Sequence, residues 1–298
     1  MPAQGDPRWG RADSHVALHA AAGKLALCRS LQRNLDCLRE IRNATMSATP
    51  PELSVVIPFY NEAANVAPLL AELHDLLASL AIAAEVICVD DGSRDTTAAE
   101  LAAAARNWPD LRIQKIPQNR GQAAALRQGF QVSRGAWIAT LDGDGQNPPA
   151  ELGRLWARRE CADMIVGVRT NRQDSALRLA MSRFANTVRR ALLRDGVSDT
   201  GCSLKLFRRE VAASFLPIRT MYSFLPAFAV AAGFTVREVP VTHRPRRAGE
   251  SKYGLRVMAG RPMLDMLVLA WRLRRGRWSN ASGTPPRTGT KQRSGIKS

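Results

Sequence analysis

The sequence predicts an α/β protein whose mostly parallel sheet carries helices on both faces, and three observations predict this class. Short runs rich in β-branched residues alternate with longer segments of helical spacing from Leu53 onward. Clusters of acidic residues follow three of the predicted strands, where ligands bind in sheets of this kind. With 45% hydrophobic residues, the chain of 298 residues can bury the core that such a fold needs.

The first part of the predicted domain repeats strand and helix in strict alternation. The run from Leu53 to Phe59 predicts the first strand, and 62–80 places Val and Leu at helical spacing. Strands are then expected at 85–89, 111–116 and 136–141, and helices at 96–106 and 121–133. This alternation predicts parallel pairing, because a helix that crosses over the sheet connects strands of the same direction.

The pattern loosens after Leu141, although strands and helices can still be assigned. Helices are expected at 149–159, 175–193, 222–232 and 254–275, and strands at 163–168, 204–207 and 235–241. A turn-rich loop at 198–203 precedes the strand at 204–207. The sequence predicts an N-terminal extension at 1–50 and a main domain at 51–254. The extension is either poorly ordered or an addition before a natural start at Met46. The sequence also predicts an amphipathic helix at 255–277 and a disordered basic tail at 278–298.

Composition and charge narrow the classes of protein that fit. Five cysteines without a Cys-x-x-Cys pair argue against a disulfide framework and a zinc site. No apolar run reaches the roughly 18–20 residues that span a bilayer. The net charge is +17, and residues 244–298 hold fourteen Lys and Arg against two acidic residues. Such a basic segment attracts lipid phosphates, nucleic acid or an anionic substrate, and charge alone does not choose among them.

The three acidic clusters are expected at one edge of the sheet. They lie at 58–62, 89–97 and 140–147, each directly after a predicted strand. Clustered carboxylates repel one another unless a cation or a hydrogen-bond donor lies among them. The clusters therefore predict a ligand site at this edge.

The pair Asp142 and Asp144 predicts a site for Mg²⁺ or Mn²⁺. Alternate residues of an extended segment point the same way, so both carboxylates can face one ion, and Gln146 adds an amide oxygen on the same side. Gly143 and Gly145 would let a diphosphate approach the backbone. The alternative is a solvated Asp-Gly turn, but the position after a buried strand beside two other acidic clusters favours the metal site.

Asp90 and Asp91 have two possible roles. A carboxylate at a strand end can accept a hydrogen bond from the ring N–H of a nucleobase. The alternative is capping of the following helix, for which Asp95 and Thr96 are also suited. Both roles are compatible, and Glu62 similarly suits the first turn of a helix.

Four ordered motifs resemble those of family 2 glycosyltransferases. They read VVIPFYNE, VDDGSRDTT, NRGQAAALRQGF and TLDGDGQNPP, and the resemblance extends from about Leu53 to about Arg275. The sequence is most similar to dolichol-phosphate mannosyltransferase and the bacterial polyprenyl-phosphate glycosyltransferases. The resemblance implies a GT-A fold with a Rossmann-like sheet, a nucleotide-sugar donor and one divalent cation, Mg²⁺ or Mn²⁺. It assigns these residues to the donor site: Pro58, Tyr60, Glu62, Val89, Asp90, Asp91, Gly143, Lys205, Arg244 and Arg247. The family often has Lys at the position of Gln122, so a charge contact to the donor is expected to be missing.

The basic second half is expected to bind the acceptor. Arg169 ends a predicted strand at the same edge, and Arg178 and Ser182 lie on one face of a predicted helix. In similar enzymes matching positions bind a polyprenyl phosphate, whereas the alternative is a solvated basic helix. The segment 243–254 resembles the family's mobile loop, with Arg244, Arg247 and Lys252 over the donor. Asp142, Asp144, Arg169 and Lys252 are accordingly the expected catalytic residues.

The sequence thus predicts metal-dependent transfer of a sugar to a polyprenyl phosphate such as dolichol or undecaprenyl phosphate, with inversion to a β-linked product. An ionised phosphate needs no general base, whereas a sugar hydroxyl normally does. We expect peripheral attachment to an anionic membrane, at the cytoplasmic face of the inner membrane, through residues 255–277. The apolar face of this helix has core packing as its alternative.

Two other functions remain open from the sequence. One is a soluble family 2 glycosyltransferase acting on a saccharide or protein hydroxyl, with Asp199 or another acidic residue as the base. The other is a basic nucleic-acid-binding protein with a degenerate transferase fold. No nucleic acid is expected as a partner, because no basic strand rich in aromatic residues supports base stacking.

Overall fold

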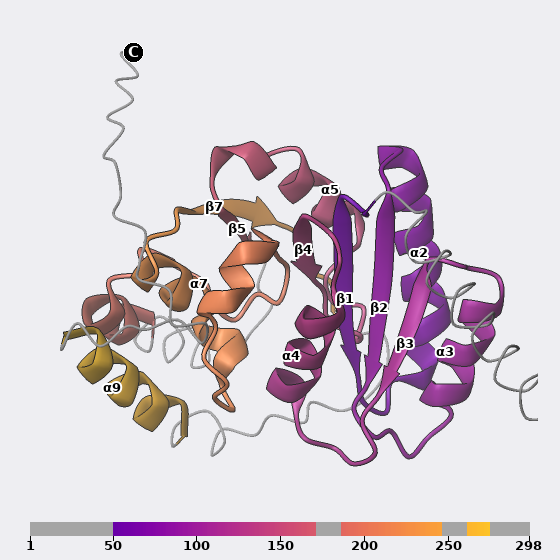
Figure 1. The fold of residues 1–298 in the computed structure, drawn as a ribbon, viewed down its shortest axis with the longest axis horizontal. Helices are drawn as coiled ribbons and strands as arrows, with labels where there is room; N and C mark the ends of the chain where they lie inside the picture. Colours follow the sequence, from indigo (N-terminus) through magenta and orange to yellow (C-terminus); the bar gives the residue numbers. More distant parts are fainter. Residues whose placement is uncertain (1–49, 171–185, 246–260, 275–298) are drawn as a thin grey trace, which may run out of the picture. The chain divides into compact units, whose positions relative to one another are not determined.

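The structure is a computed structural model that describes residues 50–170, 186–245 and 261–274 (Figure 1). The predictions for residues 1–49, for the tail beyond residue 274, and for the segments 171–185 and 246–260 lie outside the described residues. They include the predicted start at Met46, the acceptor residues Arg178 and Ser182, and the loop residues Arg247 and Lys252.

The first part of the domain has the predicted alternation. Strand β1 (Leu53–Phe59) leads into α2 (Ala63–Leu80) and β2 (Ala84–Asp90). The elements that follow are α3 (Thr97–Arg106), β3 (Leu111–Lys115), α4 (Gln122–Val132) and β4 (Trp137–Thr140). All of the elements expected from 53 to 141 are therefore confirmed, with ends that differ by at most one residue.

The second part of the domain, from Ala150 onward, contains the remaining helices and strands. They are α5 (Ala150–Trp156), η2 (Arg159–Cys161), β5 (Met164–Arg169), β6 (Lys205–Arg208), η3 (Arg209–Ser214), α7 (Met221–Ala231), β7 (Val236–Val241) and α9 (Arg261–Arg274). Residues 186–193 are also helical. The helix expected at 149–159 ends earlier, at Trp156.

The seven strands form one mixed sheet in the order β3-β2-β1-β4-β6-β5-β7. Strand β6 runs antiparallel to β4 and β5, and the other neighbours are parallel. The expectation of a mostly parallel sheet is confirmed. The chain passes from β1 to β2 and β3 on one side and then returns to β4 on the other side. Open α/β sheets bind ligands outside the strand ends at such a reversal.

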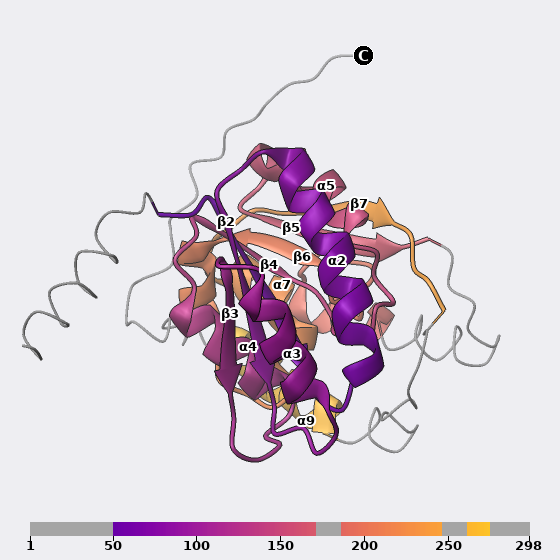
Figure 2. The ribbon, with the colours of Figure 1, turned by 90° about the vertical axis from the view of Figure 1, so that its right-hand side faces the viewer.

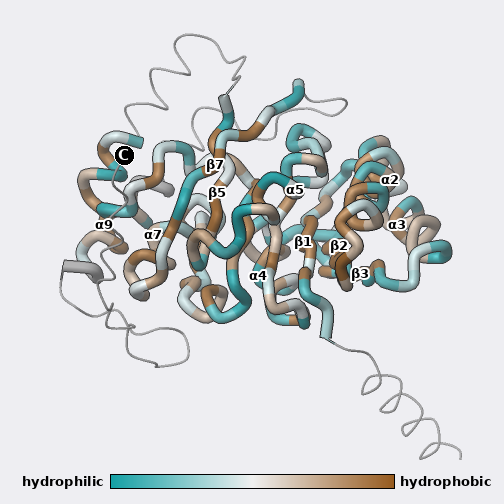
Figure 3. The backbone as a smooth tube through the Cα atoms, turned by 90° about the horizontal axis from the view of Figure 1, so that it is seen from above, coloured by the Kyte–Doolittle hydropathy of each residue, from teal (hydrophilic) through white to brown (hydrophobic). Residues whose placement is uncertain are grey.

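Alternation along β1 divides the core into two layers. Val55 and Ile57 pack with leucines of α2 and with α5, whereas Val56 packs on the opposite face with α4 and α7. Figure 2 shows α2 and α3 in front of the sheet on one face, and Figure 3 shows hydrophobic residues concentrated in β1, β2 and β5. The helices on both faces bury each row of strand side chains and hold the strand ends in place.

Helix α9 is apolar on two opposite sides. Met266, Leu269 and Ala270 are buried in the core layer that contains α7. Thr220, just before α7, donates a hydrogen bond of 2.6 Å from its hydroxyl to Asp265 Oδ2. The exposed large side chains recur at helical spacing and form what we call the α9 stripe: Leu264, Leu267, Val268 and Trp271. The core-packing alternative therefore accounts for one side of the helix only. Among the described helices, none is both long and apolar enough to cross a membrane.

Candidate active site

The sheet brings the three acidic clusters to one edge, as the sequence predicted. Phe59 at the end of β1 pairs with Asp90 at the end of β2, and β4 lies on the other side of β1 and ends at Thr140. The backbone N–H of Asp91 donates to Phe59 O at 2.9 Å, so the second cluster is fixed directly against the first.

Asp142 and Asp144 lie close enough for their charges to interact. Burial of Asp142 and the charge of Asp144 raise the pKa of Asp142 to about 6, against a hydrogen bond with Ser203 and the charges of Lys205 and Arg169, which lower it. Gln122 Nε2 donates to Asp142 Oδ1 at 2.7 Å. Asp144 is 7% exposed, and its Oδ1 accepts the backbone N–H of Gln146 at 3.1 Å. The two carboxylates are adjacent and are held mainly by neutral donors. A cation between them would relieve the repulsion of their negative charges.

These residues fit a hard divalent cation. Two carboxylates and the amide of Gln146 offer oxygen ligands, which Mg²⁺ and Mn²⁺ prefer. Within the described ranges, no group of three or more His, Cys, Asp and Glu side chains could hold a metal. The three side chains would fill part of the coordination sphere, and Mg²⁺ usually keeps several waters and takes substrate phosphates as further ligands.

The two glycines of this loop differ in their surroundings. A Cβ on Gly143 would lie 2.6 Å from Phe59 Cδ1 and 2.8 Å from Pro58 O, so this glycine permits close packing on β1. Gly145 has a φ of +71°, and a Cβ there would meet nothing within 4 Å. Of the two, Gly145 has the open surroundings expected for the approach of a diphosphate.

Asp90 and Asp91 are both buried and both accept backbone hydrogen bonds. Asp91 Oδ1 accepts Arg120 N at 2.8 Å, and Oδ2 accepts Gly121 N at 2.7 Å, which fixes the start of α4. Asp90 Oδ1 accepts Ser93 N at 3.0 Å. An ionised carboxylate has about four lone-pair positions, so these two bonds leave Asp91 able to accept another. Its contact with a nucleobase stays a prediction.

The structure also resolves the capping alternative. Asp95 Oδ1 accepts Thr97 N at 3.0 Å, whereas Thr96 makes no side-chain cap bond. Glu62 precedes α2 and accepts a bond of 2.7 Å from Asn65 Nδ2. Among the other residues assigned to the donor, Pro58 and Tyr60 are half-buried at the end of β1. The side chain of Val89 is fully buried in the core beside α4, and a contact of this residue with a donor stays a prediction.

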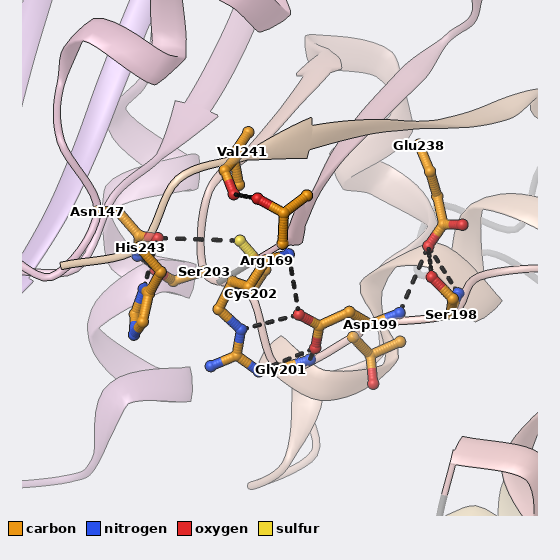
Figure 4. Close-up of polar contacts among 12 residues, drawn as sticks. Asn147, Arg169, Ser198, Asp199, Gly201, Cys202, Ser203, Glu238, Val241 and His243 are labelled. Atoms are coloured by element: carbon orange, nitrogen blue, oxygen red, sulfur yellow. Dashed lines mark hydrogen bonds and ion pairs between the residues drawn. The ribbon is translucent and has the colours of Figure 1, made fainter. Parts of the chain in front are cut away.

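Arg169 and Asp199 form an ion pair near Asp142 (Figure 4). Arg169 donates to Asp199 from Nε at 2.8 Å and from Nη2 at 2.9 Å, and its backbone N–H adds a bond at 3.3 Å. The backbone N–H of Gly201 donates to Asp199 Oδ1 at 3.1 Å. The carboxylate of Asp199 is therefore held by a cation and two backbone groups.

Lys205 lies on β6, and its side chain is buried against the loop 198–204. It is 2% exposed, and its ammonium donates to Cys202 O and, at 3.4 Å, to Thr200 O. Burial lowers its pKa, while the nearby Asp142 and Asp199 act in the opposite direction. The ammonium supports the loop 198–204 from below, and contact of Lys205 with donor phosphates stays a prediction.

The guanidinium of Arg244 pairs with Glu72 on α2. Nη1 lies 3.0 Å from Oε1 and 2.9 Å from Oε2, and the backbone N–H of Arg244 donates to Gln146 O at 2.8 Å. Here too the predicted contact with the donor remains a prediction, and the structure gives the side chain another partner.

Sequence reasoning missed the contribution of Asn147. Its Nδ2 donates to Ser203 Oγ at 2.7 Å, and its Oδ1 lies 3.4 Å from His243 Nδ1 (Figure 4). Ser203 in turn bonds Asp142. The position of Asn147 in the motif that carries Asp142 was the available signal. Its partners are 56 and 96 residues away in sequence, so only the fold reveals them.

Comparison with known proteins gives consistent results. The model of Glycosyl transferase family 2 matches residues 54–216, more than half of the chain. An undecaprenyl-phosphate 4-deoxy-4-formamido-L-arabinose transferase from Pseudomonas paraeruginosa is 40% identical over 203 residues, which are 67% of this chain and 60% of that protein. The transferase of the same name from Shewanella sediminis is 39% identical over 205 residues, 68% of this chain and 62% of its own length. The chain thus spans less than two thirds of the length of these relatives.

A solved structure supports the fold assignment. Glucosyl-3-phosphoglycerate synthase from Mycobacterium tuberculosis, in complex with Mn²⁺ and UDP-glucose, superposes with a TM-score of 0.56 at 17% identity. The match covers 74% of this chain and 79% of that chain. At this identity the likeness concerns the fold alone, and it confirms the expected GT-A fold.

Proposed function

Because the chain belongs to glycosyl transferase family 2, we propose that it transfers a sugar from a nucleoside diphosphate sugar to a polyprenyl phosphate. The names of its relatives support this acceptor class, since they are called undecaprenyl-phosphate transferases.

The observation that carries the proposal is the engagement of Asp199. A hydroxyl acceptor needs a base to remove its proton. Asp199 is the residue that sequence reasoning offered for this task, and its oxygens accept two guanidinium and two backbone N–H bonds. A carboxylate so occupied has little capacity to take a proton. An acceptor phosphate is already ionised at pH 7 and needs no such base.

The donor side of the site is proposed to bind the diphosphate through a cation. Asp142 and Asp144, with Gln146, would hold Mg²⁺ or Mn²⁺, which supplies positive charge to the departing nucleoside diphosphate. Pro58, Tyr60 and Asp91 would hold the nucleoside part. In the transfer a phosphate oxygen of the acceptor bonds to the anomeric carbon as the bond to the diphosphate breaks. Attack from the face opposite the diphosphate inverts that carbon.

The acceptor phosphate is proposed to bind near Arg169, with Arg178 and Ser182 as further contacts. Arg169 is 16% exposed at the end of β5, and its pairing with Asp199 fixes the direction of the guanidinium. Lys252 and Arg247 are proposed to contact the donor phosphates.

We also propose that the α9 stripe lies in the headgroup region of an anionic membrane. Leu264, Leu267, Val268 and Trp271 are 64%, 50%, 54% and 47% exposed, which is unusual for large apolar side chains recurring on one helix side. Residues 244–298 carry fourteen basic and two acidic residues, a charge that suits anionic lipid. The proposal is peripheral attachment at the cytoplasmic face of the inner membrane, where a polyprenyl phosphate would be reached from the lipid surface.

The test of the proposed activity is an acceptor and donor panel. Purified protein is incubated with Mn²⁺ or Mg²⁺, undecaprenyl phosphate and individual nucleotide sugars, including nucleotide-linked forms of the 4-deoxy-4-formamido-L-arabinose in the relatives' names. Lipid mass spectrometry should detect a glycosyl phospholipid, and NMR of the product should give the inverted configuration. Transfer to free saccharides but not to the lipid phosphate would support the hydroxyl-acceptor alternative instead.

The membrane proposal has its own test. Replacing Leu267 and Trp271 with Ser should abolish flotation with anionic liposomes, because both side chains lie on the exposed side of α9. Transfer to a short-chain, water-soluble polyprenyl phosphate should remain, which separates membrane binding from folding. Unchanged flotation would contradict the assignment of the stripe.

A further inference from the structure

The three residues after β7 each contact the segment that follows Asp144. Thr242 Oγ1 donates to Glu151 Oε1 at 2.7 Å, and His243 Nδ1 lies 3.4 Å from Asn147 Oδ1. Arg244 N donates to Gln146 O at 2.8 Å. We call residues 242–244 the clasp, since its residues contact positions 151, 147 and 146 in reverse order.

The clasp connects distant parts of the sheet. Strand β7 is the edge strand, and β4, β6 and β5 separate it from β1. The clasp reaches from β7 to the loop after β4, and its last residue, Arg244, reaches α2 on the layer over β1. The position of Gln146 is therefore fixed from both sides, by Asp144 through its own N–H and by Arg244 through its carbonyl.

Glu72 holds the outer end of the clasp. Both of its oxygens accept Arg244 Nη1, at 3.0 Å and 2.9 Å. The side chains are 32% and 39% exposed, so the pair lies at the surface of the site and not within the core. Glu72 lies in the third turn of α2.

We propose that Glu72 is a positioning residue for the cation-binding loop, acting through the Arg244 backbone on Gln146. The proposal rests on the proposed function, because it needs Gln146 to serve the cation. The pair sets where the Arg244 N–H lies, and this N–H sets the Gln146 carbonyl and hence the direction of the amide side chain. Residues that orient metal ligands from outside the coordination sphere typically change metal affinity by about 10- to 100-fold when lost.

A positioning role and a merely structural role predict different measurements. A half-exposed ion pair contributes roughly 0–1 kcal/mol to stability, so the melting temperature should hardly change when it is broken. Metal affinity should change much more, because the position of a ligand depends on the pair. The two readouts are therefore measured on the same variants.

The experiment reverses the charges of the pair. Glu72→Arg and Arg244→Glu are made singly and together, and Mn²⁺ binding is titrated by electron paramagnetic resonance without donor. Each single variant should bind Mn²⁺ about tenfold more weakly than the unmodified protein. The double variant should recover to within about twofold, because the opposite charges again attract. Glu160→Arg is the matched control: Glu160 pairs at 3.1 Å with Arg208, whose exposed fraction of 39% equals that of Arg244, and Mn²⁺ affinity should be unchanged.

Two results would overturn the proposal. Single variants with unmodified Mn²⁺ affinity would show that the pair does not act on the loop. A double variant no better than either single variant would show that Arg244 acts by another route, such as direct contact with the donor phosphates. If the unmodified protein transfers sugar and binds Mn²⁺, these failures concern the positioning role alone. An unmodified protein that does neither removes the proposed function as well.

Discussion

Two regions of the site hold their carboxylates in different ways. The proposed donor region, here called the donor edge, contains four aspartates: Asp90, Asp91 and Asp144 accept bonds from backbone N–H groups, and Asp142 accepts one from the amide of Gln122. In the proposed acceptor region, here called the acceptor edge, Asp199 is paired with the guanidinium of Arg169, and Lys205 lies buried nearby. Neutral donors leave the charge of a carboxylate in place, whereas a guanidinium cancels it.

The difference explains why one region suits a cation and the other suits an anion. The charges of Lys205 and Arg169 lower the pKa of Asp142, but burial and the charge of Asp144 outweigh them and raise it to about 6. The acceptor edge has its carboxylate neutralised, so an incoming phosphate meets little repulsion there. On the proposed function, this contrast would give the strand ends two neighbouring subsites, one that prefers a cation and one that prefers an anion.

The largest expected effect comes from removing charge at the donor edge. Asp144→Asn keeps the shape of the side chain and its ability to accept the Gln146 N–H, but it removes one of two adjacent charges. Turnover with Mn²⁺ should fall by about 100- to 1,000-fold, as when a key electrostatic contact of a transition state is lost. The measurement is the initial rate of glycosyl lipid formation across a Mn²⁺ titration. A rate within twofold of the unmodified protein would contradict the role of the donor edge.

The next effect concerns stability at the acceptor edge. Arg169→Ala leaves the carboxylate of Asp199, which is 8% exposed, without its guanidinium partner. Breaking such a pair should cost about 3 kcal/mol in the free energy of unfolding. Urea unfolding of the single variants and of the Arg169→Ala, Asp199→Ala double variant gives the coupling. Additive losses would mean that the pair does not neutralise Asp199 in the way the comparison requires.

The fold was largely predictable because its signals are local. The β-branched run at Leu53–Phe59 and the leucines of α2 fix a strand and a helix without reference to the rest of the chain. The antiparallel direction of β6 was not predicted. It depends on pairing with β4 and β5, from which Lys205 is separated by about forty residues or more.

The candidate site was predictable in composition and less so in contacts. The acidic clusters were expected at one edge, since the carboxyl ends of parallel strands meet there. The partners of Arg244 and Lys205 were not foreseen, because a basic side chain near a predicted phosphate site has many acceptors in reach. Only the fold shows that Glu72 lies beside Arg244, 172 residues away, and that Lys205 points towards two carbonyls.

Glu85, at the opposite end of the strands, sharpens the comparison, because its carboxylate accepts bonds from both neutral donors and guanidinium groups. Glu85 is buried, and it accepts bonds from Ser54, from Arg134 N and from the guanidinium groups of Arg112 and Arg134. Burial acts to raise its pKa, but these bonds outweigh burial and hold the pKa below the ordinary value of 4.5. Glu85→Gln should therefore cost about 2 kcal/mol of stability at neutral pH, the usual scale of hydrogen bonds to a charged group.

The pH dependence of this effect has a definite sign. A lowered pKa in the folded state means that Glu85 stabilises the protein above pH 4.5, and that this contribution is lost as the pH falls through the folded-state value. Chemical unfolding from pH 7 to pH 3 measures it. The gap between the unmodified protein and the Glu85→Gln variant should close towards low pH. A gap of constant size would contradict the assignment of the charge.

The smallest expected effect tests whether neutral donors are needed at the donor edge. Gln122 Nε2 bonds Asp142 at 2.7 Å, at a position where similar proteins often have Lys. Gln122→Lys would place an ammonium beside Asp142, lowering its pKa from about 6 and repelling an incoming Mn²⁺. Mn²⁺ affinity should weaken about tenfold, the scale of one partly screened charge at this separation. Gln122→Met is the matched control, because it removes the bond without adding charge and should have a smaller effect. If both variants weaken Mn²⁺ binding equally, Gln122 acts by orienting Asp142 and not by being uncharged. That result would contradict the view that the donor edge needs neutral donors.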